Sequence, residues 1–476
     1  MNHATPGREA LPHLGRVVFL SAVAALGGFL FGFDSGVING AVAALQKTFR
    51  SDAIGSGFNV ASMLLGCALG AFCAGALADK YGRKSILIAT SVVFIVSAWG
   101  SGIAASSAEF VFYRVIGGLA VGAASILSPA YIGEIAPASI RGRLISLQQL
   151  AIVLGLVSSF LSNYILASIA GGAAHTLWLG FQTWRWMFWV ELLPALLFFL
   201  SLLRIPESPR YLVAAGKPEK ALATLAGMTD PCAAQQQVAH IQATVLRKRK
   251  PRLSDMLIPR TGRLHPIVWV GVALAALQQF TGINVVFYYG AVLWQAVGFT
   301  EDDALLTNVI SGIVNVAFTV LAIHLVDRVG RRPLLMIGAV GQAFSLGLLA
   351  ILFVVAAQHT VEGVTMTRTG GALALCAANV YIAFFAFTWG PVMWVMLGEM
   401  FPNKFRGAAL AVAGLAQWLA NFLVTITFPI MLRDLGLGVS YGLYAAFGVV
   451  AFFVVRGHVT ETRGRTLEEI SLEHAR

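Results

Sequence analysis

Long apolar stretches recur along the whole chain, with short polar segments between them. A helix that crosses the hydrocarbon core of a bilayer needs about 20 mostly apolar residues. Twelve stretches meet this requirement, and we therefore predict an all-α integral membrane protein with twelve transmembrane helices. The predicted spans are 17–42, 55–78, 85–105, 109–131, 144–170, 184–203, 265–294, 304–326, 333–357, 371–398, 408–432 and 440–457.

Composition supports this interpretation, because 58% of the residues are hydrophobic and only 12% are charged. Soluble globular domains carry about one quarter charged residues. The first sixteen residues are polar, and the apolar run after them is too long for the hydrophobic part of a signal peptide. We expect the first helix to remain in the mature protein.

One long polar segment, 204–264, divides the spans into two sets of six. The predicted organisation is an N-terminal half (1–203), a linker with short helices (204–264), a C-terminal half (265–458) and a tail (459–476). Within the linker, PEKALATLAG at 218–227 indicates a short amphipathic helix on the cytoplasmic face. We expect this helix to latch the two halves together.

Lysine and arginine are distributed unevenly between the two sides of the membrane. Of 33 basic residues, 27 fall in segments on one side and five on the other, with Arg114 inside a span. Basic residues in short loops are retained in the cytoplasm. We predict that both termini are cytoplasmic and that the protein lies in the plasma membrane, which is the inner membrane if the protein is bacterial. The net charge of +11 is therefore topological and requires no nucleic-acid partner.

Short charged signatures occur twice, once in each half. ALADKYGRK pairs with HLVDRVGRR, GEIAPASIRG with GEMFPNKFRG, and PESPRYL with TETRGRTL. The halves are therefore copies of one six-helix unit, an arrangement typical of secondary transporters that expose a midplane site to each side alternately. Solvated loop charges alone would not explain the paired acids. We predict a cytoplasmic gate network of Asp79, Arg83, Glu134, Arg141, Glu207, Arg210, Asp327, Arg331, Glu399, Arg406 and Glu461.

Three ionisable residues, Asp34, Arg114 and Glu191, fall well inside the predicted spans. At 1.5 Å per residue, all three lie about 7 to 12 Å below the outer ends of their helices, so they can meet. Two acids around one arginine form a coupled site in which a carboxylate can exchange a proton while the guanidinium changes partner. The alternative is a static buried ion pair that only fixes helix packing.

Amides and aromatic side chains are unusually frequent within the spans. A sugar is neutral, with hydroxyls around an apolar ring face, so its site needs amides beside aromatic surfaces. Each single amide could instead form an interhelical hydrogen bond of about 0.6 to 2 kcal/mol. We expect breaks near Gly282 and at Gly390–Pro391, where the helices would bend as gates. The set comprises Gln148, Gln149, Gln278, Gln279, Asn284, Asn315, Trp394, Gln417 and Trp418.

These signatures, together with QQFTGINVVFYY at 278–289 and WGPVMW at 389–394, resemble the sugar porter family of the major facilitator superfamily. The resemblance covers essentially the whole chain and is closest to bacterial D-xylose/proton symporters and bacterial hexose transporters. It implies that Asp34 couples proton movement with Arg114 as its partner. It also implies the sugar contacts Phe31, Gln149, Gln278, Gln279, Asn284, Tyr288, Asn315, Gly390, Trp394, Gln417 and Trp418.

The predicted function is proton-coupled symport of a monosaccharide by alternating access. A proton-independent facilitator is the alternative, and a sugar sensor on the same fold is a further one that would need an output domain. An enzyme is disfavoured, because no nucleophile with its base and no phosphate loop is visible. The four cysteines and nine histidines have no metal-ligand spacing. We expect no cofactor or metal, and a protein that works as a monomer in the lipid bilayer with a sugar and protons as its ligands.

Overall fold

The computed structural model describes residues 14–137, 140–247, 253–258, 262–360, 363–402 and 404–463. Among these residues, 12 helical segments are long and apolar enough to span a membrane, which confirms the predicted all-α fold. The N-terminal half contains α1 (Leu14–Phe49), α2 (Ala53–Tyr81), α3 (Arg83–Ile103), α4 (Ser107–Ile135), α5 (Arg141–Ala170), α6 (Thr183–Val190) and α7 (Leu192–Arg204). The C-terminal half contains α11 (Pro266–Phe280), α12 (Ile283–Gln295), α13 (Glu301–Val329), α14 (Arg331–Val355), α15 (Arg368–Phe387), α16 (Trp389–Met400), α17 (Arg406–Asp434) and α18 (Gly436–His458).

Short elements complete the architecture at the two ends of the bundle. A 3₁₀ turn, η1 (Trp178–Gly180), precedes α6, and the linker forms α8 (Pro209–Ala214), α9 (Pro218–Ala226), α10 (Pro231–Arg247) and η2 (Leu253–Met256). The helix expected at 218–227 is α9, whereas its latching role stays a prediction. An antiparallel hairpin, β1 (Ala357–Thr360) and β2 (Gly363–Met366), joins α14 to α15.

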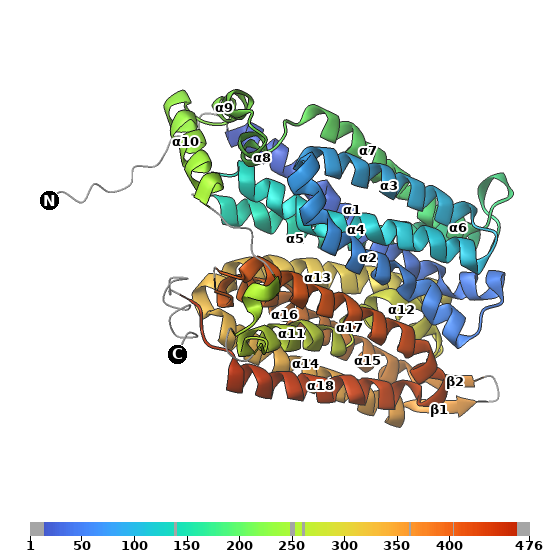
Figure 1. Ribbon diagram of the computed structural model, residues 1–476. Helices are drawn as coiled ribbons and strands as arrows, with labels where there is room; N and C mark the ends of the chain where they lie inside the picture. Colours follow the sequence, from blue (N-terminus) through green and yellow to red (C-terminus); the bar gives the residue numbers. More distant parts are fainter. Residues whose placement is uncertain are drawn as a thin grey trace.

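Figure 1 shows the two halves as separate bundles lying side by side, with α8, α9 and α10 at one end and the β1–β2 hairpin at the opposite end. We call the end that carries α8–α10 the linker end and the opposite one the far end. The linker helices α8–α10 pack around a small apolar core of their own, formed by Leu212, Val213, Ala221, Leu225, Ala234 and Val238.

Glycine allows the helices of the N-terminal half to approach very closely. Gly66 and Gly70 of α2 face Gly118 and Gly122 of α4, and a side chain at any of these positions would collide with the opposing backbone. Paired glycines four residues apart give membrane helices this close backbone contact. Since Arg114 lies one turn before Gly118 on α4, the close packing brings its side chain against α2 and the interior.

Helix breaks interrupt three of the spans. The predicted break in the seventh span is confirmed, because α11 ends at Phe280 and Gly282 begins α12 with a left-handed φ of +81°. Glycine is the residue that adopts this conformation without a steric penalty.

The break in the tenth span lies at Thr388, with φ −126° and ψ −92°, two residues before the expected position at Gly390. Proline lacks an N–H, and its ring clashes with the carbonyl of the residue four positions earlier. Pro391 therefore disturbs the chain near Phe387 and Thr388, while Gly390 itself lies within α16.

The sixth span has a third break that we did not predict, between α6 and α7 at Glu191. Pro194 lies three residues after Glu191, as Pro391 lies three residues after Thr388. The same proline effect therefore accounts for both breaks, and Pro194 was the sequence signal for this one. The break places Glu191 at a helix junction in the core.

Candidate functional site

The Asp34 carboxylate and the Arg114 guanidinium form an ion pair in the core of the N-terminal half. Arg114 Nη1 bonds Asp34 Oδ1, and Nη2 lies 3.3 Å from the Asp34 carbonyl and 2.8 Å from Met63 Sδ. The guanidinium also lies over the Phe188 ring, 5.6 Å from its centroid. Asp34 and Arg114 are 2% and 1% exposed, so the pair is almost fully removed from solvent.

Glu191 is 1% exposed and is the second acid of this group. Its closest charged neighbours are Asp34 and Arg114, but it makes no ion pair with Arg114. Its Oε2, Asp34 Oδ2 and Arg114 Nε are all buried without a hydrogen-bond partner. The structure thus brings the three predicted residues together, with Arg114 bonded to one acid and the other acid unpaired.

Four predicted amides form a continuous hydrogen-bonded chain at the break between α11 and α12. Gln278 Oε1 accepts from Gln279 Nε2 at 3.0 Å and from Gln417 Nε2 of α17 at 2.9 Å. Gln279 Oε1 in turn accepts from Asn284 Nδ2 at 2.6 Å. A straight helix would place Gln279 and Asn284 on different faces, so the break at Gly282 is what lets them meet.

The amide chain is anchored to the second broken helix. Gln278 Nε2 donates to the Trp389 carbonyl at 2.7 Å, directly after the α15–α16 break. The breaks in the seventh and tenth spans are therefore bonded to each other. Gln417 Oε1 is buried without a partner, which leaves an acceptor for a ligand hydroxyl.

The predicted aromatic sugar contacts come from both halves. Phe31 of α1 and Trp418 of α17 have ring centroids 5.9 Å apart. Tyr288 is buried near Ser35 and Asn421. The other predicted contacts comprise half-buried Gln149, buried Asn315, half-buried Gly390 and Trp394, whose side chain is 38% exposed.

Sequence reasoning included Gln148 among the candidate amides but not among the sugar contacts, and it overlooked Asn39 and Asn421, whose positions within the spans were the available signal. Gln148 is 5% exposed, lies against Gly28 of α1, and has no hydrogen-bond partner on either amide atom. Asn421 faces Tyr288 from α17. Asn39 of α1 bonds the C-terminal half: it donates to the Phe287 carbonyl at 2.7 Å and accepts from Asn308 Nδ2 at 2.8 Å.

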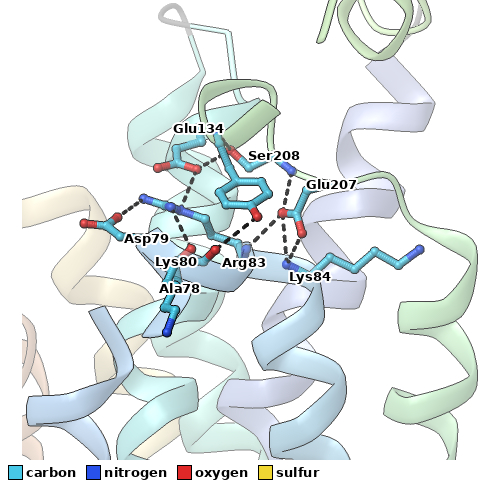
Figure 2. A network of polar contacts seen from close by, with 9 residues as sticks. Ala78, Asp79, Lys80, Arg83, Lys84, Glu134, Glu207 and Ser208 are labelled. Carbon is cyan, nitrogen blue, oxygen red and sulfur yellow. Dashed lines mark hydrogen bonds and ion pairs between the residues drawn. The ribbon is translucent and has the colours of Figure 1, made fainter. Parts of the chain in front are cut away.

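The charged signature of the N-terminal half forms a compact network at the linker end, which Figure 2 shows around Arg83. Arg83 Nε lies 3.2 Å from Glu134 Oε2 and Nη2 lies 3.0 Å from Asp79 Oδ1. Glu207 accepts from the backbone N–H of Arg83 at 2.9 Å and of Lys84 at 3.0 Å. The network ties α2, α3, α4 and the start of the linker together.

The C-terminal half repeats the contacts of Arg83 with Glu134 and of Glu207 with the backbone at the equivalent residues. Arg331 forms two bonds to Glu399, at 3.1 and 3.0 Å, and Glu461 accepts from the backbone N–H of Arg331 and Arg332. The turn glycines are also equivalent, with φ +98° at Gly82 and +104° at Gly330. The internal duplication inferred from short motifs is thus present in the geometry.

The remaining predicted gate residues are Arg141, Arg406, Arg210 and Asp327. Arg141 bonds the Ala136 carbonyl at 3.3 Å, and Arg406 bonds the equivalent Phe401 carbonyl at 3.1 Å. Arg210 is exposed at the start of α8. The Asp327 side chain lies outside the described residues.

Hydrogen bonds between the two halves gather at the far end. Besides the bonds of Asn39, Ser168 Oγ donates to Asp302 Oδ1 at 2.5 Å, and the Ala173 N–H donates to Glu301 Oε1 at 2.8 Å. The charged networks of Arg83 and Arg331, by contrast, bond residues of their own half. The far end is therefore the closed end in this structure. Within the described part of the chain, no group of histidine, cysteine or acidic residues could hold a metal.

The chain folds into two related six-helix bundles, with breaks in three spans and a chain of hydrogen-bonded amides at one of these breaks. These features define the class of membrane transporters with the major facilitator superfamily fold. Comparison with known proteins agrees, since the family model "Sugar (and other) transporter" matches residues 20–473. The chain belongs to this sugar transporter family.

Individual relatives are similar over nearly their whole length. A "Glucose transport protein" of Synechocystis sp. is 51% identical over 99% of this chain and 100% of its own. The "D-xylose-proton symporter" of Escherichia coli is 40% identical over 95% of this chain and 94% of its own. A solved structure described as a partially occluded inward open conformation of the xylose transporter XylE has a TM-score of 0.82 and 38% identity, covering 95% and 100% of the two chains.

Proposed function

We propose that this protein is a proton-coupled monosaccharide symporter that works by alternating access. The observation that carries this proposal is the buried group of Asp34, Arg114 and Glu191, in which one arginine is bonded to one of two acids. A charged side chain inside the membrane costs several kcal/mol of free energy unless it is paired or hydrated. Charged residues that are kept there commonly mark proton relays.

The coupling step follows from the arrangement of these three groups. Proton uptake by Asp34 removes the negative charge that holds Arg114, and the guanidinium can then turn to Glu191. That exchange alters the contact between α1 and α4, because Asp34 and Arg114 are the residues that join them there. One charge moved through 100 mV supplies about 2.3 kcal/mol, enough for a roughly fifty-fold sugar gradient.

The substrate site proposed is the amide chain of Gln278, Gln279, Asn284 and Gln417, with Phe31 and Trp418 beside it. The amides supply donors and acceptors for hydroxyls, and the two rings supply apolar surface. Because Gln278 bonds the chain at the α15–α16 break, a sugar that rearranges the amides acts on both broken helices at once. The relatives' printed substrates, glucose and D-xylose, favour a pentose or hexose.

The orientation proposed places the linker end, with both termini, in the cytoplasm, as the distribution of basic residues predicts. The structure then has its extracellular side closed. The protein is proposed to act as a monomer, since one chain provides both halves around the site.

A proton-independent facilitator is the second candidate. The description of the Synechocystis relative, "Glucose transport protein", mentions no proton. A buried ion pair can also have a purely structural role in helix packing. The two candidates differ in one observable, which is proton movement driven by sugar.

The test is sugar-evoked alkalinisation of the medium around proteoliposomes without a membrane potential, using xylose, glucose and galactose in turn. A symporter takes up protons with one of these sugars. Asp34→Asn should abolish this proton signal while exchange of labelled sugar continues. Sugar entry without proton movement in the unsubstituted protein would establish the facilitator instead.

Asp52→Asn is a matched control for this experiment. Asp52 caps α2 by accepting from the Gly55 N–H at 2.8 Å, away from the buried group. Asparagine caps helices about as well as aspartate. The control should therefore keep both proton uptake and sugar exchange.

A further inference from the structure

An apolar groove of about 510 Å³ lies on the outside of the C-terminal half. Its floor and walls come from α14, α15 and α18, and Val340 and Phe344 are 53% and 71% exposed. Because it lies on a membrane-spanning segment and opens away from the bundle, it faces the hydrocarbon of the bilayer. The lining residues are Met336, Ile337, Val340, Gly341, Phe344, Phe384 and Phe452.

The groove exists because Gly341 has no side chain. A Cβ at Gly341 would collide with the Phe384 ring of α15, so the ring lies directly against the α14 backbone. The α14 residues of the lining form one stripe along the helix, from Met336 to Phe344. Eight residues of helix span about 12 Å, which is close to the depth of one leaflet, about half of the 30 Å hydrocarbon core.

Two arginines lie at the linker end of this stripe. Arg332 precedes Met336 by four residues on α14, and Arg456 follows Phe452 by four residues on α18. Residues four apart share a helix face, so both arginines continue the walls of the groove beyond its apolar part. Arg332 Nη2 donates to the Arg456 carbonyl at 2.8 Å, which holds the two residues together.

The positive charge of these arginines is available at this mouth. Arg456 is exposed and Arg332 is half-buried, and no acid of the described residues neutralises the Arg332 Nε, which has no hydrogen-bond partner. The carboxylate of Glu461, at the same end of the bundle, accepts from the backbone N–H groups of Arg331 and Arg332. Its carboxylate is thus occupied by the backbone, and it forms no ion pair with the Arg332 guanidinium.

We propose that this groove binds an anionic phospholipid, with an acyl chain along Met336–Phe344 and the phosphate on Arg332 and Arg456. Basic sites between membrane helices on the cytoplasmic side are suited to acidic headgroups. The depth of the groove matches a tail that starts at the headgroup level, and the charge at its mouth selects against zwitterionic lipids. The site lies entirely within the C-terminal half and is independent of the sugar site.

The test measures lipid bound to the purified, delipidated transporter by native mass spectrometry, after titration with phosphatidylglycerol or phosphatidylcholine. Phosphatidylglycerol should bind at least ten-fold more tightly than phosphatidylcholine. Arg332→Gln combined with Arg456→Gln should remove this preference, and Val340→Trp, which fills the groove, should lower the occupancy of phosphatidylglycerol at least ten-fold.

Matched variants keep the result interpretable. Lys47→Gln removes an exposed positive charge at the far end, and Val449→Trp adds an indole to an exposed position on α18 outside the groove. Both should bind phosphatidylglycerol as the unsubstituted protein does. If the double arginine variant does not fold, Arg456→Gln alone serves, because the Arg456 side chain is exposed and its carbonyl, not its guanidinium, bonds Arg332.

Three outcomes would overturn the proposal. Equal binding of the two lipids would show a non-selective annulus, and phosphatidylglycerol binding that survives both arginine substitutions would place the headgroup elsewhere. Inorganic phosphate that displaces the lipid completely at equal concentration would show that the apolar groove contributes nothing.

Discussion

The side-chain amides of Asn39 and Asn308 meet across the two halves, where Asn308 Nδ2 donates to Asn39 Oδ1 at 2.8 Å. Asn39 Oδ1 also accepts from the Ala291 N–H at 3.2 Å, and Nδ2 donates to the Phe287 carbonyl. Asn39 is 1% exposed, so water does not compete for these bonds. One side chain of α1 thus joins both α12 and α13 at the closed far end.

We predict that Asn39→Ala destabilises the closed far end by roughly 1.5 to 4.5 kcal/mol. The substitution removes three hydrogen bonds, each contributing about 0.5 to 1.5 kcal/mol net, and leaves Asn308 unpaired. The population should shift toward the state open at the far end by roughly 10- to 2,000-fold. Spin labels at Lys47 and Arg433, in opposite halves at this end, would report the increased distance.

Asn379→Ala is the control for this shift, since Asn379 Nδ2 bonds only the Leu375 carbonyl of its own helix, at 2.9 Å. It should leave the distance distribution unchanged. An unchanged distribution for Asn39→Ala as well would mean that the far end is held closed by apolar packing.

Substitution of Gln278 by alanine should weaken sugar binding by ten-fold or more. Gln278 orders Gln279 and Gln417 and bonds Trp389, so its loss disturbs the amide chain and leaves partners unpaired. Loss of a hydrogen bond with buried partners costs about 1 to 3 kcal/mol. Calorimetric titration with the transported sugar would measure the change in Kd.

Gln236→Ala, an exposed position on α10, is the matched amide control. If Gln278→Ala changes neither the Kd for the sugar nor the thermal midpoint, Gln278 is not part of the sugar site.

Gly282→Ala should abolish most transport while the protein still inserts into the membrane. Alanine disfavours the left-handed φ of +81° by about 1 to 2 kcal/mol, and its Cβ would lie 2.6 Å from Tyr444 Cδ2. The break between α11 and α12 would straighten or shift, separating Asn284 from Gln279. Uptake of labelled sugar by proteoliposomes measures the effect.

Gly347→Ala provides the comparison, because nothing lies within 4 Å of a Cβ at this helical position. It should transport normally and gain up to about 1 kcal/mol of stability from helix propensity. Full transport by Gly282→Ala would show that the break does not require a left-handed residue.

Helix number, the duplication and the pairing of Asp34 with Arg114 could be predicted because each follows from local composition, motif spacing or depth along a span. The break at Glu191 could not be predicted from hydropathy, which stays high through Pro194. Its position depends on which carbonyl the proline ring displaces, and Thr388 shows the same three-residue offset from Pro391.

Contacts between the halves were beyond sequence reasoning for a different reason. Asn39 lies among apolar residues, and its partners are 248 to 269 residues away in the chain. Nothing local distinguishes it from an amide that bonds its own helix, as Asn379 does. The same holds for the order of the amide chain, since the bend at Gly282 rotates Asn284 by an angle that the sequence does not encode locally.

The Glu461 carboxylate should make folding stability depend on pH. Partial burial alone would raise its pKa, but bonds from the backbone N–H groups of Arg463, Arg331, Arg332 and Thr462 outweigh burial, so its pKa is lowered. A lowered pKa in the folded state means that the carboxylate stabilises the fold above the ordinary glutamate pKa of about 4.3. This stabilisation is lost as the pH falls through the lowered pKa.

Glu461→Gln should therefore lower the thermal midpoint at about pH 7. The difference in thermal midpoint between this variant and the unsubstituted protein should become smaller as the pH falls below about 4.5. Melting the detergent-solubilised protein across this range measures the difference. Glu219→Gln, at an exposed position on α9, should change the midpoint little at any pH. A Glu461→Gln difference that is the same at every pH would mean that the carboxylate stays ionised throughout or contributes only by its shape.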